Sequence, residues 1–157
     1  MREVRQSERK RGEVILEVAM TAQENKAIAR QTYDLFIAGN TSAMMDAYAD
    51  DIVWIFPEVK GIPFGGIYQG KDGVQEFFRK LRDAVETLSM TPQRFVAEDD
   101  QVVAAGTTTR KGRATGMTYT TTWMHMLTFK NGKLTRFEVY DNTAAIAEAL
   151  TAPSPRA

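Results

Sequence analysis

The stretch TYTTTWMHMLTFKNGKLTRFEVYD, residues 118–141, decides the fold. On both sides of Asn131-Gly132, apolar and polar residues alternate, which is the period of a β-strand with one buried face. Asn-Gly between two alternating runs is the strongest short-range signal for a β-hairpin, because both residues tolerate the positive φ of a type I′ turn. We therefore predict two antiparallel strands, over Thr118–Lys130 and Lys133–Asp141.

The sequence before and after this hairpin adds further strands and several helices. Alternation predicts strands over 93–98 and 101–110, and a β-branched, aromatic run predicts a strand over 52–56 that ends at Pro57. Helical spacing of apolar residues predicts the following helices: 21–39, 42–49, one from the Asp72 cap through Leu88, and a closing one that begins at Asn142 or Thr143 and ends at Leu150. This order predicts an α+β fold in which three helices cover one face of a curved sheet.

Composition bounds the class of protein. The chain has 157 residues, the size of one ordinary domain, and 20 basic residues balance 20 acidic ones. That balance gives no basic field for nucleic acid or an anionic membrane. With no cysteine and one histidine, we expect neither a metal site nor a cofactor held by such ligands. We expect a cytoplasmic protein without metal or cofactor.

The ends of the chain differ from its centre. Residues 1–20 mix charges with a short apolar run that Glu17 interrupts, so they fit neither a secretory signal nor a membrane span. We interpret residues 1–20 as an N-terminal extension, flexible or helical, residues 21–150 as one domain, and residues 151–157 as a C-terminal tail.

Four segments resemble SnoaL-like polyketide-cyclase domains in order and spacing. They are Tyr33-Asp-Leu-Phe-Ile-Ala-Gly-Asn40, Tyr48-Ala-Asp-Asp51 with Val53-Trp54, Gly70-Lys-Asp-Gly-Val-Gln-Glu-Phe-Phe78 and Phe129-Lys-Asn-Gly-Lys-Leu134. The resemblance implies the nuclear transport factor 2-like fold, a cone whose pocket lies between three helices and a strongly curved, mainly antiparallel sheet. It also implies a homodimer through the sheet. Function does not follow from fold alone, because one scaffold hosts several chemistries.

The catalytic residues of known relatives are not retained in this sequence. Where the resemblance to ketosteroid isomerase implies a carboxylate base, Phe56 stands before Pro57. The Asp–Arg–Asp relay of limonene epoxide hydrolase would fall on Thr107, Thr109 and Val139, so that mechanism is absent. The acid/base aspartate of SnoaL-type cyclases falls on His125. The scaffold matches, and the chemistry must come from other residues.

His125 is the first candidate for catalysis, because an imidazole exchanges protons near neutral pH. A strict two-residue hairpin places Glu138 opposite His125, as a base and its orienting carboxylate. In that register, however, the face that carries Phe137, Val139 and Asp141 points away from the pocket that the resemblance implies. A β-bulge would reverse this, and the sequence leaves both registers open. A histidine on the outer face or at a dimer contact is the alternative.

Two further polar residues are candidates. Asp141 lies at a strand end, where an acid serves either as a catalytic group at a pocket mouth or as a helix cap. Tyr33 lies on the first helix and offers either a hydroxyl donor in the cavity or an ordinary core tyrosine.

Aromatic and apolar side chains form a candidate wall for a flat apolar ligand, although the same residues also suit a plain core. The substrate-binding candidates are Trp54, Phe56, Phe64, Tyr68, Trp123, Met124, Phe137 and Val139.

Three functions remain open. The first is a cofactor-free enzyme that abstracts a proton next to the carbonyl of a small apolar molecule, giving isomerisation, cyclisation or dehydration. In it, His125 moves the proton, Asp141 or Glu138 assists, and Tyr33 donates to the developing oxyanion. The second is a pocket that binds an apolar metabolite without turnover. The third is an interaction domain that uses the outer face of the sheet.

Overall fold

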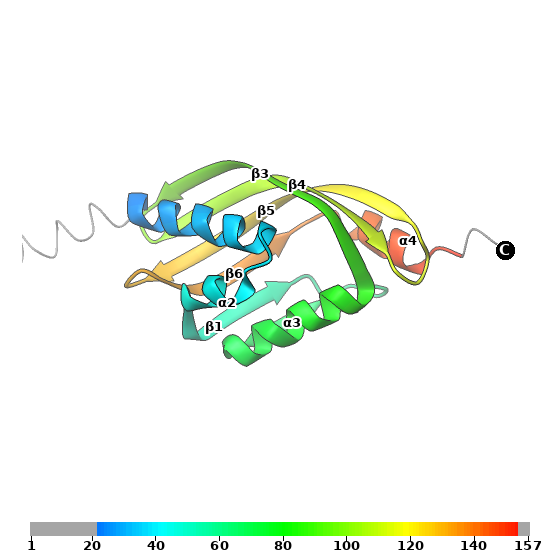
Figure 1. The fold of residues 1–157 in the computed structure, drawn as a ribbon, viewed down its shortest axis with the longest axis horizontal. Helices are drawn as coiled ribbons and strands as arrows, with labels where there is room; N and C mark the ends of the chain where they lie inside the picture. The colour runs from blue at the N-terminus through cyan, green and yellow to red at the C-terminus, as the bar shows by residue number, and fades with distance from the viewer. Residues whose placement is uncertain (1–21, 154–157) are drawn as a thin grey trace, which may run out of the picture.

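The computed structural model describes residues 22–153, and it has two layers. Figure 1 shows a curled, open sheet with the first helix and α3 lying against one side of it. The four helical segments are residues 22–37, α2 (Thr41–Asp46), α3 (Gly70–Ala84) and α4 (Thr143–Thr151). None of the helices in the part that the structure describes is long and apolar enough to cross a bilayer.

Six strands form the sheet in the order β2-β1-β6-β5-β4-β3. They are β1 (Tyr48–Phe56), β2 (Gly66–Gln69), β3 (Val85–Glu98), β4 (Gln101–Gly112), β5 (Thr118–Lys130) and β6 (Lys133–Tyr140). Neighbouring strands are antiparallel except for β1 and β6, which are parallel. The α+β class and the mainly antiparallel sheet are confirmed.

The hairpin that decides the fold is confirmed. Asn131 and Gly132 have φ of 51° and 74°, as a type I′ turn requires, and Lys130 pairs with Lys133 across it. The cap of the last helix is confirmed as well, because the Asn142 side chain accepts a hydrogen bond from the Ala145 N–H at 3.1 Å.

A β-bulge near the turn settles the register of β5 and β6. Phe129 pairs with Leu134, but the next pair is Thr128 with Arg136, so Thr135 is the extra residue on β6. The Thr135 hydroxyl donates to the Thr128 carbonyl at 3.1 Å, so this carbonyl has a hydrogen-bond partner where the bulge disrupts the strand pairing.

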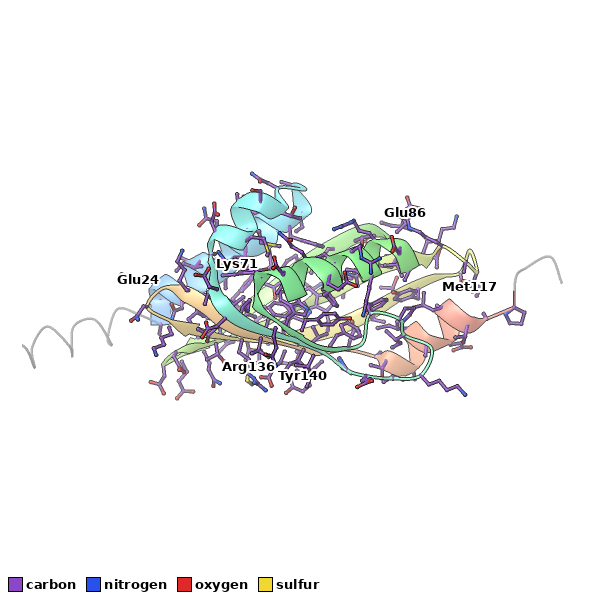
Figure 2. The ribbon with its side chains drawn as sticks, turned by 90° about the horizontal axis from the view of Figure 1, so that it is seen from below. Glu24, Lys71, Glu86, Met117, Arg136 and Tyr140 are labelled. Carbon is purple, nitrogen blue, oxygen red and sulfur yellow. The ribbon has the colours of Figure 1, made fainter. Side chains whose placement is uncertain are left out.

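This one-residue shift turns β6 over, because neighbouring side chains on a strand point to opposite faces. His125 now pairs with Val139, and Glu138 pairs with Met126. The predicted pairing of His125 with Glu138 is therefore wrong, and the bulged alternative is correct. Phe137 and Val139 are buried under the helices, whereas Tyr140 is 56% exposed. Figure 2 shows Arg136 and Tyr140 on the side of the sheet away from α3.

Several element boundaries differ from the expectation. The helix predicted over 42–49 ends at Asp46, and β1 begins at Tyr48 instead of residue 52. The sequence did not predict the short strand β2, which pairs with the end of β1.

The third helix ends at Ala84 instead of continuing to Leu88, and β3 begins at Val85 instead of residue 93. Contacts distant in sequence stop the helix, because Arg113 donates its backbone N–H to the Ala84 carbonyl and its Nε to the Arg82 carbonyl.

The predicted N-terminal extension, residues 1–20, lies outside the described residues, as do residues 154–157 of the predicted tail. The helix α4 reaches Thr151, one residue beyond the predicted domain end.

Gly106 allows an aromatic ring to lie flat on the sheet. It pairs with Trp123 across β4 and β5, and a Cβ added at Gly106 would lie 2.6 Å from the Trp123 ring and closer still to the Thr91 carbonyl oxygen. The space above Gly106 is therefore filled by the indole of Trp123, whose Nε1 donates to the Thr108 hydroxyl at 2.6 Å.

Replacing Gly106→Ala should destabilise the protein by about 1–3 kcal/mol, the usual cost of forcing a methyl group into a packed site. Urea unfolding measures this free energy. Thr107→Ser, an outward-facing change on the same strand, is the control and should stay within about 0.5 kcal/mol of the native value. Equal stability of native and Gly106→Ala proteins would contradict the close approach of Trp123.

Candidate active site

A cavity of about 60 Å³ lies between the helices and the inner face of the sheet. Alternation along β4, β5 and β6 directs every second side chain toward it, and the bulge brings Phe137 and Val139 into that set. Its walls are mostly aromatic rings: Tyr33, Phe36, Tyr48, Trp54, Phe56, Phe77, Phe78, Trp123 and Phe137. The polar side chains that line the same space include His125, Arg110 and Asp141.

Three flat rings stack along one wall of this cavity. The ring centroids of Trp123 and His125 are 4.1 Å apart and nearly parallel, and Tyr33 stacks at 5.7 Å from Trp123 and 5.8 Å from His125. Offset stacking at these distances is favourable. The stack holds the imidazole in one plane, so its two nitrogens have fixed directions.

A buried hydrogen bond of 2.6 Å joins the Tyr33 hydroxyl to His125 Nδ1. Within residues 22–153, the Tyr33 hydroxyl has no other hydrogen-bond partner. A buried hydroxyl needs an acceptor for its proton, so we assign Tyr33 as the donor and Nδ1 as the acceptor. The imidazole proton then lies on Nε2, which makes no hydrogen bond with any of these residues. A neutral imidazole with this tautomer offers one N–H donor.

Burial lowers the pKa of His125 to about 3, and the positive charge of Arg110 lowers it further in the same direction. Burial also raises the pKa of Tyr33. Both groups are therefore neutral near pH 7. A neutral imidazole with so low a pKa takes up a proton poorly, which favours a role as donor over a role as proton shuttle.

Asp141 follows the last residue of β6 and lines the cavity. Burial raises its pKa, while the nearby Thr121 hydroxyl, the Asn142 N–H and the Arg110 guanidinium act in the opposite direction. The Asn142 N–H donates to Asp141 Oδ1 at 2.7 Å. The cap of α4 is Asn142, not Asp141, so the cap alternative for Asp141 is wrong. A half-buried carboxylate with a raised pKa is a better proton acceptor than an exposed one.

Arg110 is a site residue that sequence reasoning missed. It is 9% exposed, lines the cavity from β4, and donates from Nε to the Thr87 hydroxyl at 3.1 Å. Burial lowers its pKa, and Tyr119 and Asp141 raise it. The signal was present in the sequence, because Arg110 shares the inward face of β4 with Val102, Ala104 and Thr108.

The remaining candidates divide between the two faces of the sheet and the core. Trp54, Phe56, Trp123, Phe137 and Val139 line the cavity, as a wall for a flat ligand requires. Phe64 and Tyr68 are buried in the core without lining it, and the Tyr68 hydroxyl donates to the Phe64 carbonyl at 3.0 Å.

Two of the candidates lie outside the cavity altogether. Met124 is 51% exposed on the outer face. Glu138 is on that face as well, in an ion pair with Arg136 at 3.0 Å. Both predictions, Met124 as substrate-binding and Glu138 as catalytic, are wrong because strand alternation directs them away from the cavity.

The sequence of residues 29–137 matches the model of the SnoaL-like domain. This chain belongs to the SnoaL-like domain family. The fold agrees, because the solved structures that resemble this SnoaL-like chain are nuclear transport factor 2-like proteins. Among curated proteins, none matches this chain significantly.

Three solved structures illustrate the likeness. A nuclear transport factor 2-like protein from Burkholderia xenovorans is 27% identical, with a TM-score of 0.75 over 84% of this SnoaL-like chain and 99% of its own. One of unknown function from Burkholderia pseudomallei is 26% identical, with a TM-score of 0.76 over 82% and 98%. TerC, co-crystallised with polyporic acid, is 26% identical, with a TM-score of 0.71 over 82% and 99%.

The residues that the structure describes include no group of three or more His, Cys, Asp or Glu side chains placed to hold a metal ion.

The functional groups of the site are a neutral histidine–tyrosine pair, one carboxylate and one guanidinium, set in aromatic walls. This set can donate a hydrogen bond, accept a proton and stabilise a negative charge.

We expect the ring of His125, the single histidine, to stay neutral with its proton on Nε2 from pH 8 down to pH 5. Two-bond ¹H–¹⁵N correlation spectra measure both the tautomer and the titration. With a pKa lowered to about 3, protonation begins only at lower pH. Tyr33→Phe is the control, and it should allow both tautomers because it removes the donor to Nδ1. A titration midpoint near 6.5 would contradict the burial of this ring.

Proposed function

We propose that this protein is a SnoaL-like enzyme that removes a proton from the carbon next to a carbonyl group of a small, largely apolar molecule. Isomerisation, cyclisation and dehydration all pass through this step. The observation that carries the proposal is the buried hydrogen bond between Tyr33 and His125, made in the same aromatic cavity that Asp141 lines.

Asp141 is the base in this proposal. Its raised pKa brings its proton affinity closer to that of a base active at neutral pH, and partial burial removes water that would compete for it. Asp141 also lies near the stack, since only Tyr140 separates it from Val139, the cross-strand partner of His125. The carbon acid would lie between Asp141 and the imidazole.

His125 polarises the carbonyl. With Nδ1 accepting from Tyr33, the Nε2–H donates to the carbonyl oxygen and to the enolate that forms from it. A neutral imidazole suits this role, because it gains no proton and needs only to hold its hydrogen bond. Tyr33 is then a positioning residue that fixes the tautomer, instead of the oxyanion donor that the sequence suggested.

The small volume and the aromatic walls of the cavity favour a compact ligand with a flat ring. A volume of about 60 Å³ is well below the 300–1,000 Å³ of common ligand sites, so side chains must move on binding. Met44 and Met90 line the cavity and are unbranched, which makes such movement inexpensive. TerC, which is 26% identical to this chain, was co-crystallised with polyporic acid.

A pocket that binds an apolar ligand without turnover is the second candidate. Phe56, which lines the cavity, occupies the position where ketosteroid isomerase has its base, and this observation favours binding alone. Proton exchange separates the two candidates, since a mere binding pocket has no base to catalyse it.

The test is deuterium uptake from D₂O next to the carbonyl of 3-benzoylpropanoate, its primary amide and acetophenone, followed by ¹H NMR. We expect the native protein to accelerate uptake for at least one of them and Asp141→Asn to reduce the rate about 100- to 10,000-fold, the usual contribution of a general base. Asparagine keeps the acceptor oxygen for the Asn142 N–H, so the backbone that leads into α4 should keep its conformation.

Glu138→Gln is the matched control, because it removes a carboxylate of β6 from the outer face, where it forms an ion pair with Arg136. Its exchange rate should equal that of the native protein. An equal loss in Glu138→Gln and Asp141→Asn would refute Asp141 as the base, and native protein that binds these ketones without exchange would support the binding pocket.

We also propose a homodimer through the outer face of the sheet. Met124 and Tyr140 pair across β5 and β6 and are 51% and 56% exposed, and Val96 on β3 is 57% exposed on the same face. Figure 2 shows Tyr140 directed away from the helical layer. Apolar groups gathered on one side of a sheet favour association with a second copy.

Light scattering after size exclusion should give twice the chain mass for the native protein and one chain mass for Met124→Lys/Tyr140→Glu. Lys60→Glu, a change at an exposed residue outside the sheet, is the control and should remain dimeric. A native protein that is still monomeric at about 100 μM would contradict the proposal, because a stable dimer has a Kd far below this concentration.

A further inference from the structure

We propose that Arg110 binds a carboxylate of the ligand, so that the substrate is a keto acid and not an uncharged ketone. The inference deepens the function proposed above and rests on it for the position of the reacting carbonyl, but the anion site itself stands on separate observations.

The first observation is the burial of a permanent positive charge in an aromatic cavity. Arg110 is 9% exposed and lines the same space as His125 and Asp141. A guanidinium stays charged in proteins. On burial it loses its hydrogen bonds to water, which must be replaced by a counter-charge or by other hydrogen-bond partners, or its burial costs free energy.

The second observation is the small number of partners that the protein gives it. Within residues 22–153, Arg110 makes one side-chain hydrogen bond, from Nε to the Thr87 hydroxyl. No carboxylate of this part of the chain lies within 4.0 Å of its guanidinium. The Tyr119 hydroxyl is the other polar group near enough to act on the pKa of Arg110 through a hydrogen bond. A guanidinium has five N–H donors, so Arg110 keeps donors for a ligand carboxylate.

The third observation is a pair of buried hydroxyls near the charged groups of the cavity. By the 3.5 Å criterion, the Tyr119 and Thr121 hydroxyls have no hydrogen-bond partner among the described residues. Tyr119 lies near Arg110 and Thr121 near Asp141, because each acts on the pKa of that group. Tyr119 pairs with Arg110 across β4 and β5, and Thr121 is on the same inward face of β5. Native proteins rarely leave such groups unsatisfied, and two donors beside a cation suit the second oxygen of a bound carboxylate.

The positions along the sheet also fix the order of groups in the ligand. On β5, Tyr119 and His125 are six residues apart, about 20 Å along an extended strand, and Arg110, the cross-strand partner of Tyr119, lines the same cavity as His125. Asp141 follows Tyr140, which pairs with Met124, so along the sheet it lies between the levels of Tyr119 and His125. A ligand with its carbonyl at His125 Nε2 would present its α-carbon to Asp141 and its carboxylate to Arg110.

A bound carboxylate would also strengthen Asp141 as a base. The ligand takes the place of Asp141 as the counter-charge of Arg110, and a second negative charge nearby raises the proton affinity of a carboxylate. Arg110 is thus a specificity-determining residue whose ligand also tunes the base.

The test compares the affinities of 3-benzoylpropanoate and 3-benzoylpropanamide, which have the same shape and differ in charge. Calorimetric titration should show the acid binding the native protein at least 10-fold more tightly. In Arg110→Met, the affinity for the acid should fall about 10- to 100-fold, as expected for hydrogen bonds to a charged group, and the affinity for the amide should not change. Arg136→Met, on the outer face, is the control and should bind both as the native protein does.

Thermal unfolding supplies the check on folding. If Arg110 serves a ligand, Arg110→Met should have an unchanged or higher Tm without ligand, because a buried charge with few partners is replaced by an apolar chain. A Tm lowered by several degrees would identify Arg110 as structural and overturn the inference. No preference for the acid in the native protein, whether both probes bind or neither does, would overturn it too.

The two proposals fail in different ways. If the protein prefers the acid because of Arg110 but catalyses no deuterium exchange, the anion site is supported and the proposed enzyme activity is refuted. If exchange depends on Asp141 but the acid and the amide bind equally well, the enzyme activity is supported and the anion site is refuted.

Discussion

The one extra residue between β5 and β6 is the constraint on which the site depends. A strand has only two faces, so a shift of one position exchanges its buried and exposed side chains completely. Thr135 supplies this shift, and Phe137, Val139 and Asp141 reach the cavity beside His125 because of it. Without the bulge, the same strand would present Glu138 and Tyr140 inward, and the cavity would lose Phe137, Val139 and Asp141.

Aromatic packing allows polar groups to remain in this cavity in defined states. The stack of Tyr33, Trp123 and His125 excludes water, which keeps the imidazole neutral and makes its hydrogen bond to Tyr33 obligatory. The same exclusion of water gives the burial of Arg110 a free-energy cost, since a buried cation loses several kcal/mol of hydration. Binding sites commonly hold groups that cost stability, and this cost is the physical reason for proposing that Arg110 serves a ligand.

Local sequence signals predicted the parts of the fold that local chemistry determines. Thr118–Lys130 and the Asn131-Gly132 turn follow from alternation and from positive φ, and Asn142 follows from helix capping. The end of α3 at Ala84 did not follow, because the groups that stop it come from Arg113 in a distant loop. Neither did the bulge at Thr135, since a threonine in a strand gives no local sign of an extra residue. Arg110 was visible as a charge at an inward position, but its meaning required the cavity.

Each strand of this sheet carries two independent sets of residues on one backbone. On β5 and β6, His125 and Val139 face the cavity, while Met124 and Tyr140, one residue along, face outward. A substitution at one position therefore leaves the other face unchanged. During evolution, a lineage with this fold can exchange its catalytic residues while it conserves its surface, or acquire a new surface over an old catalytic centre. A single insertion or deletion in β6 has the opposite effect, because it replaces both sets at once.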